Sequence, residues 1–172
     1  MTAEEPFVRL LRHLGDRAVE LNEWFFDTGD LLQASTSAGL NDEEVAESLT
    51  ILLEKRILVL ARDKAGVLHG GHLTDSGLDA YLQSCRPSYL EEQLGVRRKL
   101  AQCFYKETPE VSDRKLAEAL GYPRLVVDHI LRVFARHDLL RIVGPGGRDA
   151  GEVMIDRISE EVVGGSLLGY EI

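Results

Sequence analysis

The sequence predicts a mainly α-helical protein with small β-hairpins, an α+β class, in which one arrangement of elements is built twice. Three observations predict this. Apolar residues recur at helical spacing over several segments, and two pairs of short strand-like runs flank turn-forming residues. The third is an internal repeat, because Gly39 and Gly121 lie 82 positions apart and the apolar pattern follows in register without gaps.

The repeat preserves volume and polarity more than residue identity, as two copies of one fold would. A chain of 172 residues is long enough for two compact domains of about 80 residues. The matched positions are Ala34 with Leu116, Ala38 with Leu120, Leu40 with Tyr122, Val45 with Val127, Leu49 with Leu131, Leu52 with Phe134, and Ile57-Leu58 with Leu139-Leu140.

Three helices are predicted before the first hairpin. Acidic Glu4 and Glu5 suit the N-terminus of a long amphipathic first helix, and Gly39 supplies the left-handed turn that ends a short second helix. Asn41 and Glu44 form a box-like cap for the third helix. The expected helices cover about 7–21, 30–37 and 42–56, and the buried face of the third consists of Val45, Leu49, Leu52 and Leu53.

A hairpin and a closing helix complete the first copy. Two strands are predicted at 57–61 and 67–73, on either side of a polar turn. A helix is predicted to begin at Thr74 and to run to about Ser84. Arg86-Pro87 marks the boundary, since proline disfavours helix in the residue before it. We therefore expect a first domain at 1–86, a second at 87–158 and a C-terminal tail at 159–172.

The second copy follows the same order. Ser88 and Glu91 form a capping box for a helix to about Glu107, which Thr108-Pro109 stops. Ser112 caps the next helix. The further expected elements are a helix at 113–120, a turn at 121–123 with Pro123 at the first position of the following helix, that helix to about His137, and a hairpin of strands 139–143 and 152–158 around the loop 144–151.

The tail is apolar for a chain end, with Val162, Val163, Leu167, Leu168, Tyr170 and Ile172. Such residues are costly to expose to water, so we expect the tail to dock on a domain or on a second subunit. The alternative is a disordered end.

The net charge of −9 is unevenly distributed. Up to Pro87 there are 8 Lys and Arg against 15 Asp and Glu, a net charge of −7, whereas from Gln93 to Arg148 there are 11 against 6, a net charge of +5. No apolar run has the length of a membrane helix, the acidic start is unlike a secretory signal, and Cys85 and Cys103 form no CxxC pair. These features favour a cytoplasmic protein that does not enter a membrane.

Each copy resembles the winged helix-turn-helix superfamily, from about Glu4 to Ile158. In the second copy, Leu116-Ala-Glu-Ala-Leu-Gly121 is similar to the LAxxLG second helix of bacterial regulators, followed by a third helix and the wing entry Asp138-Leu-Leu-Arg-Ile. In the first copy, Leu73-Thr-Asp-Ser-Gly77 looks like the start of the helix after the wing. Asp138 stands where many relatives have glycine, which predicts a differently built turn. The resemblance implies two tandem winged-helix domains.

In such domains the third helix enters the major groove of DNA and basic residues at helix starts and the wing hold the backbone. The third helix of the first copy is acidic there, with Glu43, Glu44, Glu47 and Glu54, and would be repelled by phosphates. The second copy supplies Arg97-Arg98-Lys99 on its first helix and the candidate DNA-binding residues Arg114, Lys115, Arg124, Arg132, Arg136 and Arg148. The alternative interpretation is an ordinary solvated helix surface.

No catalytic, cofactor or metal motif accompanies this pattern, so an enzyme is not predicted. The glycines of 144–151 lack the sequence of a phosphate loop, and His69 and His72 lack further ligands. The leading hypothesis is a DNA-binding regulator whose second domain contacts double-stranded DNA while the first mediates dimerisation or partner binding. The alternative is a tandem winged-helix scaffold or adaptor that binds proteins, and a sensor for a small effector is a third class.

Overall fold

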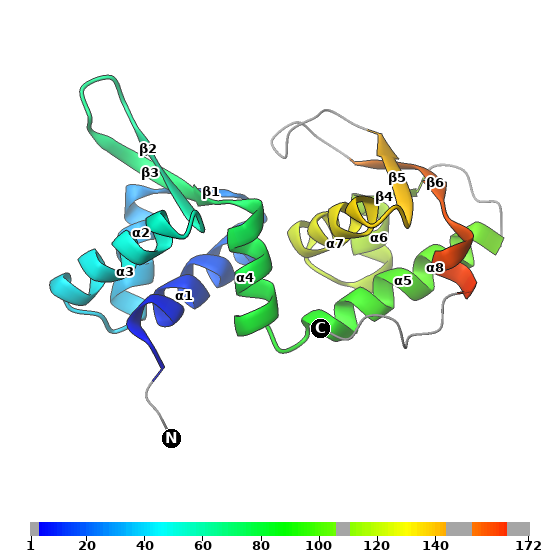
Figure 1. Cartoon of the computed structure of the whole chain (residues 1–172), viewed down its shortest axis with the longest axis horizontal. Helices are drawn as coiled ribbons and strands as arrows, with labels where there is room; N and C mark the ends of the chain where they lie inside the picture. The colour runs from blue at the N-terminus through cyan, green and yellow to red at the C-terminus, as the bar shows by residue number, and fades with distance from the viewer. Residues whose placement is uncertain (1–3, 106–110, 144–152, 165–172) are drawn as a thin grey trace. The chain divides into compact units, whose positions relative to one another are not determined.

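The computed structural model describes residues 4–105, 111–143 and 153–164. The chain divides into two compact units, Met1–Tyr89 and Leu90–Ile172, so the division lies three residues beyond the predicted boundary at 86/87. Each unit has the same order of elements: a helix, a strand, two helices, two strands and a helix (Figure 1). The class is therefore α+β, with a small antiparallel sheet in each unit.

In the first unit, the three-stranded sheet has the order β1-β3-β2. Helix α1 contacts α2, α3 and α4 and forms the centre of the helical layer (Figure 1). The core contains Leu14, Phe26 and Tyr81, each fully buried. The elements are α1 (Pro6–Leu21), β1 (Phe25–Asp27), α2 (Thr28–Ser37), α3 (Asp42–Glu54), β2 (Leu58–Arg62), β3 (Leu68–Leu73) and α4 (Asp75–Cys85).

In the second unit, the sheet has the order β4-β6-β5 and α7 contacts both α6 and β5. The core contains Leu100, Leu116 and Ile130, again almost fully buried. The elements are α5 (Tyr89–Tyr105), β4 (Val111–Ser112), α6 (Asp113–Leu120), α7 (Arg124–Arg136), β5 (Leu140–Val143), β6 (Met154–Ile158) and α8 (Glu160–Gly164).

The internal repeat is visible in the backbone hydrogen bonds. The amide of Ile57 donates to the carbonyl of Leu52 at 2.9 Å, and 82 residues later the amide of Leu139 donates to Phe134 at 3.0 Å. Gly39 and Gly121 adopt left-handed backbone angles, with φ of 65° and 68°. Helices α3 and α7 both span 13 residues and begin 82 positions apart. The two units therefore share local backbone geometry at these sites.

The turn at Asp138 has the same left-handed backbone conformation as its counterpart in the first unit. Asp138 has φ of 57°, and Arg56, 82 residues earlier, has φ of 55°. Both are in the left-handed region that glycine favours. Aspartate tolerates this conformation better than most residues, so the left-handed angle does not require glycine at this position.

Several predicted caps are confirmed. The side chain of Asn41 accepts from the amide of Glu44 at 3.0 Å, and Glu44 accepts from the amide of Asn41 at 3.0 Å. Thr74 caps α4 and Ser112 caps α6. Helix α2 begins two residues earlier than predicted because Asp27 caps it and forms a reciprocal pair with Asp30. Pro123 is at the N-cap of α7 and not at its first helical position.

Two predictions about strands and burial were wrong. Strands β1 and β4 were not predicted, because segments of three and two residues show no alternation before the partner strand is known. In α3, Leu53, which was expected on the buried face, is 37% exposed, whereas Ser48 is 1% exposed. The apolar face that α3 buries in the core is therefore narrower than its sequence suggests.

The described beginning of the tail docks on the second unit. Helix α8 places Val162 in the core, and the guanidinium of Arg97 on α5 donates to the carbonyls of Glu161 and Val162 at 3.1 and 3.3 Å. Residues 165–172 lie outside the described part. Among the described helices, none combines the length and apolar character needed to span a bilayer.

Candidate interaction surfaces

Helix α3 of the first unit presents an acidic face to solvent. Glu43, Glu47 and Glu54 are exposed, and they make no ion pair within the described part of the chain. Positions three, four, seven and eleven residues apart share one side of a helix, so Ala46, Thr50 and Leu53 lie among these carboxylates. This α3 face (Glu43, Ala46, Glu47, Thr50, Leu53 and Glu54) is both negative and partly apolar.

Helix α2 of the same unit also carries an exposed apolar residue. Leu32 on α2 is 69% exposed, the largest value among the exposed large apolar residues of the described chain. The α3 N-terminus explains part of the acidity, since Asp42, Glu43 and Glu44 lie in its first turn where the helix dipole favours negative charge. Glu47 and Glu54 lie beyond that turn, so the dipole does not explain them.

Helix α7 of the second unit is, by contrast, mostly buried. Residues 125–131 are all buried, including Asp128 and His129. Two of the three arginines on this helix that were predicted to bind DNA, Arg124 and Arg132, are held by carboxylates of the same unit. The side-chain Nε of Arg124 donates to Oδ2 of Asp113 at 2.6 Å, and Nε of Arg132 donates to Oδ2 of Asp128 at 2.9 Å.

Asp113 is the more constrained of these carboxylates. It is 2% exposed, and its Oδ1 accepts from the amide of Val153 at 3.0 Å while its own amide donates to the carbonyl of Val153 at 3.0 Å. Asp113 therefore ties the start of α6 to the residue that leads into β6, and Arg124 joins this network from the start of α7. Together Asp113, Arg124 and Val153 form what we call the Asp113 network.

The structure divides the predicted DNA-binding residues instead of bringing them together. Arg124 and Arg132 are half-buried in ion pairs, whereas Arg114, Lys115 and Arg136 are exposed and also make polar or electrostatic interactions. Arg148 lies outside the described residues. Arg97 is used to hold α8, and Arg98 donates to the carbonyl of Leu94 on its own helix.

The outer faces of the two sheets differ, which the sequence could not indicate without the strand register. In the first unit, His72 pairs with Phe25 and Val59 on its two sides, and Phe25 is 45% exposed. In the second unit, Arg141 pairs with Arg157 across β5 and β6. Both arginines are exposed, and neither was singled out from the sequence.

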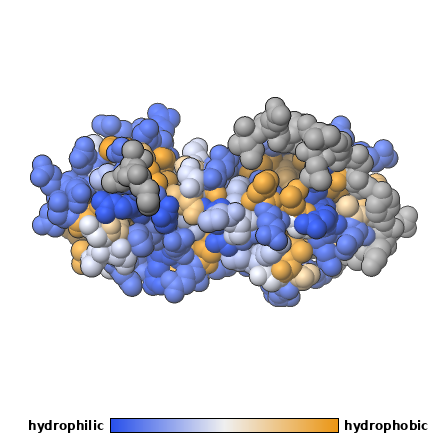
Figure 2. Space-filling view, turned by 90° about the horizontal axis from the view of Figure 1, so that it is seen from below, coloured by the Kyte–Doolittle hydropathy of each residue, from blue (hydrophilic) through white to orange (hydrophobic). Residues whose placement is uncertain are grey.

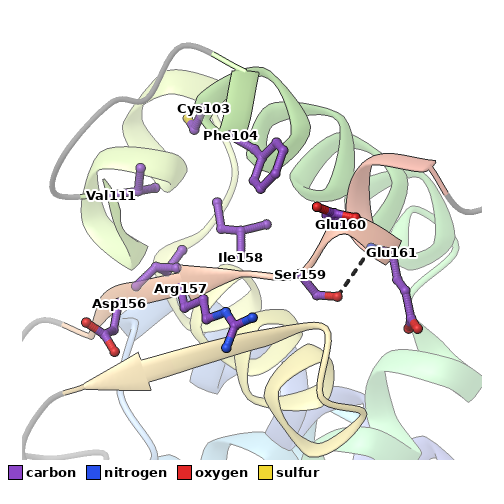
Figure 3. A pocket seen from close by; sticks show the side chains of 10 residues that line it. Cys103, Phe104, Val111, Asp156, Arg157, Ile158, Ser159, Glu160 and Glu161 are labelled. Atoms are coloured by element: carbon purple, nitrogen blue, oxygen red, sulfur yellow. Dashed lines mark hydrogen bonds between the residues drawn. The ribbon is translucent and has the colours of Figure 1, made fainter.

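A groove of about 640 Å³ lies beside β6 in the second unit (Figure 3). Phe104, Val111 and Ile158 supply apolar surface, and Asp156, Glu160 and Glu161 supply negative charge. A smaller polar cavity of about 310 Å³ lies in the first unit, where Arg17 is hydrogen-bonded to Asp30 and Glu20, both at 2.9 Å. Hydrophilic residues cover most of the face seen in Figure 2, with apolar residues in separate small areas.

No protein-family model, curated protein or solved structure matches this chain. Within residues 4–105, 111–143 and 153–164, no group of three or more His, Cys, Asp or Glu side chains is placed to hold a metal ion. The function must therefore be inferred from the surfaces described above.

Proposed function

We propose that the chain is a tandem winged helix-turn-helix protein that acts as an adaptor, binding a protein partner through the α3 face of its first unit. The observation that carries this proposal is the contrast between the two third helices. The α3 face is exposed, acidic and without ion pairs among the described residues, whereas residues 125–131 of α7 are buried and Arg124 and Arg132 are ion-paired. An adaptor is the better fit to that contrast.

The order of elements supports the winged-helix part of the proposal. A helix, a strand, two helices joined by a tight turn, and a two-stranded hairpin make up each unit, with the first strand added to the edge of the hairpin. The tight turn contains Gly39 in one unit and Gly121 in the other. These are the parts that the superfamily uses to place its third helix.

Electrostatics supports a protein partner over DNA for the first unit. Several carboxylates on a helix entering the major groove would face phosphates at close range and repel them. A partner with basic side chains would instead be attracted to Glu43, Glu47 and Glu54, and Leu53 among them supplies exposed apolar area. The net charge of −9 acts in the same direction.

Affinity capture from a nuclease-treated native cell extract tests the proposal. The tagged full chain is compared with a Glu43→Lys/Glu47→Lys variant and with a Glu23→Lys/Glu118→Lys variant, which changes the charge equally at exposed sites elsewhere. We expect the wild type and the control to retain the same proteins and the α3 variant to lose them. Equal capture by all three chains, or retention only of nuclease-sensitive material, would contradict the adaptor proposal.

The second candidate function is contact with double-stranded DNA by the second unit. It is favoured by Arg114 and Lys115, exposed at the start of α6, and by Arg136, exposed at the end of α7. Fluorescence anisotropy of a mixed-sequence duplex at low salt tests it. Binding at micromolar protein that falls with salt and disappears on Arg114→Glu/Lys115→Glu substitution would support it, and absence of binding under these conditions would exclude it.

A further inference from the structure

We infer that the outer face of the second sheet carries a binding site for one phosphate monoester group, formed by Arg141 on β5 and Arg157 on β6. The inference concerns the second unit and does not depend on the adaptor proposal. It begins from the strand register, in which Arg141 and Arg157 are direct partners in the antiparallel pair β5–β6.

The register places Arg141 and Arg157 opposite each other across β5 and β6, beside a β-bulge or irregularity between Arg141 and Ile142. Directly opposed residues have Cβ atoms about 5 Å apart, so two arginine side chains can reach one ligand. Figure 3 shows Arg157 extending from β6 toward β5, on the side opposite to Ile158 and Phe104. The side chain of Arg141 is 75% exposed, so the face is open to solvent.

The charge of the pair is incompletely balanced. Among the described residues Arg141 has one ion-pair partner, Asp156, whose Oδ2 is 3.6 Å from Nε and whose side chain is 51% exposed. Arg157 makes no hydrogen bond or ion pair in the part of the chain that the structure describes. Like charges directly opposed across two strands destabilise a sheet, and a bound anion would reverse that effect.

The first unit shows that the fold does not require this pair. There β2 and β3 pair Val59 with His72 next to the strand ends, where the second unit has Arg141 and Arg157. Leu58 opposite Leu73 and Leu140 opposite Ile158 fix the correspondence, since they occupy the preceding position in each sheet. The two arginines are thus a property of the second unit, not of the shared architecture.

A phosphate monoester fits two opposed guanidinium groups. Each guanidinium presents a planar fork of N–H donors, and a monoester dianion offers three acceptor oxygens, so both forks can bind one group. Asp156 would compete for Arg141, and the more weakly held Arg157 is the first point of contact. A carboxylate offers two oxygens and one negative charge, and satisfies the pair less fully.

The surroundings favour a single phosphate over a nucleic acid. Asp156, Glu160 and Glu161 are exposed and line the groove that Arg157 also borders. A nucleic acid gains affinity from many phosphate contacts along its length, and these carboxylates would repel the neighbouring phosphates. One phosphate on a modified side chain or on a small ester meets less of that repulsion, with Asp156 beside Arg141 as its main competitor.

Nuclear magnetic resonance of the arginine Nε–Hε groups in the full chain tests the site, with phenyl phosphate as the probe. We expect the Arg141 and Arg157 signals to move together and to saturate. Arg157→Gln and Arg141→Gln should each weaken binding about ten-fold, the loss expected for a charge-assisted hydrogen bond. Arg98→Gln, an exposed arginine on α5, should leave the affinity unchanged.

Additional probes identify the source of the phosphate. Binding of a phosphoserine peptide or of adenosine monophosphate to the same signals supports the site and assigns its ligand. The inference is overturned if phenyl phosphate does not saturate these signals, or if Arg98→Gln weakens binding as much as Arg157→Gln. It is also overturned if a dimethyl phosphate diester or duplex DNA binds there more tightly than phenyl phosphate. Far-ultraviolet circular dichroism of each variant confirms that it is folded.

Discussion

Helices α3 and α7 have equal length, equivalent turns and the same relation to the strand that follows them, yet their surfaces are opposite in character. The α3 face is exposed and acidic, whereas α7 is buried from residue 125 to 131 and its arginines at 124 and 132 pair with carboxylates. The comparison teaches that a repeated backbone does not imply a repeated function. Charge along a helix indicates a binding surface only after the internal partners of each side chain are known.

The largest expected effect is on the Asp113 network of the second unit. Asp113→Ala leaves the buried amide of Val153 without its side-chain acceptor and Arg124 without its partner, so we expect a loss of about 3 kcal/mol in the stability of the second unit. Denaturant unfolding followed by circular dichroism measures this loss.

The single tryptophan provides an internal control for that experiment. Trp24 lies in the first unit, so its fluorescence reports that unit alone. In Asp113→Ala, the denaturant concentration at the midpoint of the fluorescence transition should not change. Asp156→Ala, a substitution of an exposed residue, should change neither the fluorescence nor the circular dichroism transition appreciably. A shift of both transitions in Asp113→Ala would mean that the network is not confined to the second unit.

The next effect compares two glycines in the first helix of each unit. A Cβ at Gly15 would lie 2.1 Å from the ring of Tyr81, which is buried and whose hydroxyl donates to Asp16 at 2.6 Å. We expect Gly15→Ala to destabilise the first unit by about 2 kcal/mol, although alanine is the better helix former. Trp24 fluorescence during urea unfolding is the measurement.

Gly95→Ala is the matched change in the second unit. Its nearest neighbour is the hydroxyl of Tyr122 at 2.5 Å, at the end of a half-buried side chain that can move. The destabilisation should therefore be smaller than at Gly15. Equal losses at the two glycines would show that Tyr81 is not fixed as the structure places it.

A smaller effect is expected from the second ion pair of α7. Arg132→Gln removes the partner of Asp128, which is 8% exposed, and solvent reaches Arg132 in part. We expect a loss of about 1 kcal/mol from the second unit by circular dichroism. If Arg132→Gln left the stability of the second unit unchanged, Arg132 would be available to an external ligand. The contrast between α3 and α7 would then weaken.

The smallest effect concerns the hairpin tip of the first unit. Hydrogen bonds from the amide of Val67, and secondarily from His69 and other backbone amides, lower the pKa of Asp63 against an opposing effect of desolvation. The carboxylate therefore stabilises the turn at pH values above the ordinary pKa of 3.8, and this contribution is lost as the pH falls through the lowered pKa.

Amide chemical shifts of Ala65 and Val67 follow this titration, since Asp63 Oδ1 accepts from both at 2.8 Å. Their common midpoint should lie below 3.8. Asp63→Asn should abolish the titration while the rest of the first unit keeps its shifts. A midpoint at or above 3.8 would show that the carboxylate does not hold the turn.

Much of the fold was predictable because it depends on local signals. The Asn41 and Ser112 caps, the glycine turns and the apolar periodicity of α7 each follow from a few neighbouring residues. The edge strands β1 and β4 were not predictable, because their pairing depends on residues more than 40 positions away. The Arg141–Arg157 pair was missed although its hairpin was predicted, because only the register of β5 and β6 shows that the two residues are opposed.

The candidate site was predicted less well than the fold. The acidity of α3 was evident, but the sequence could not reveal that Arg124 and Arg132 are held by Asp113 and Asp128. Asp128 is one helical turn before Arg132, and that spacing alone could have suggested the pair. Asp113 belongs to another helix, so only the packing of α6 against α7 brings it to Arg124.

Carboxyl labelling with a carbodiimide and a small amine, read by mass spectrometry, tests the contrast between the third helices most directly. The folded chain is compared with the urea-unfolded chain, in which all carboxylates react. Our account predicts that Glu43, Glu47 and Glu54 react in the folded protein nearly as fast as in the unfolded one, and that Asp113 and Asp128 react far more slowly. Fast labelling of Asp113 and Asp128 together, or protection of the α3 carboxylates, would contradict it.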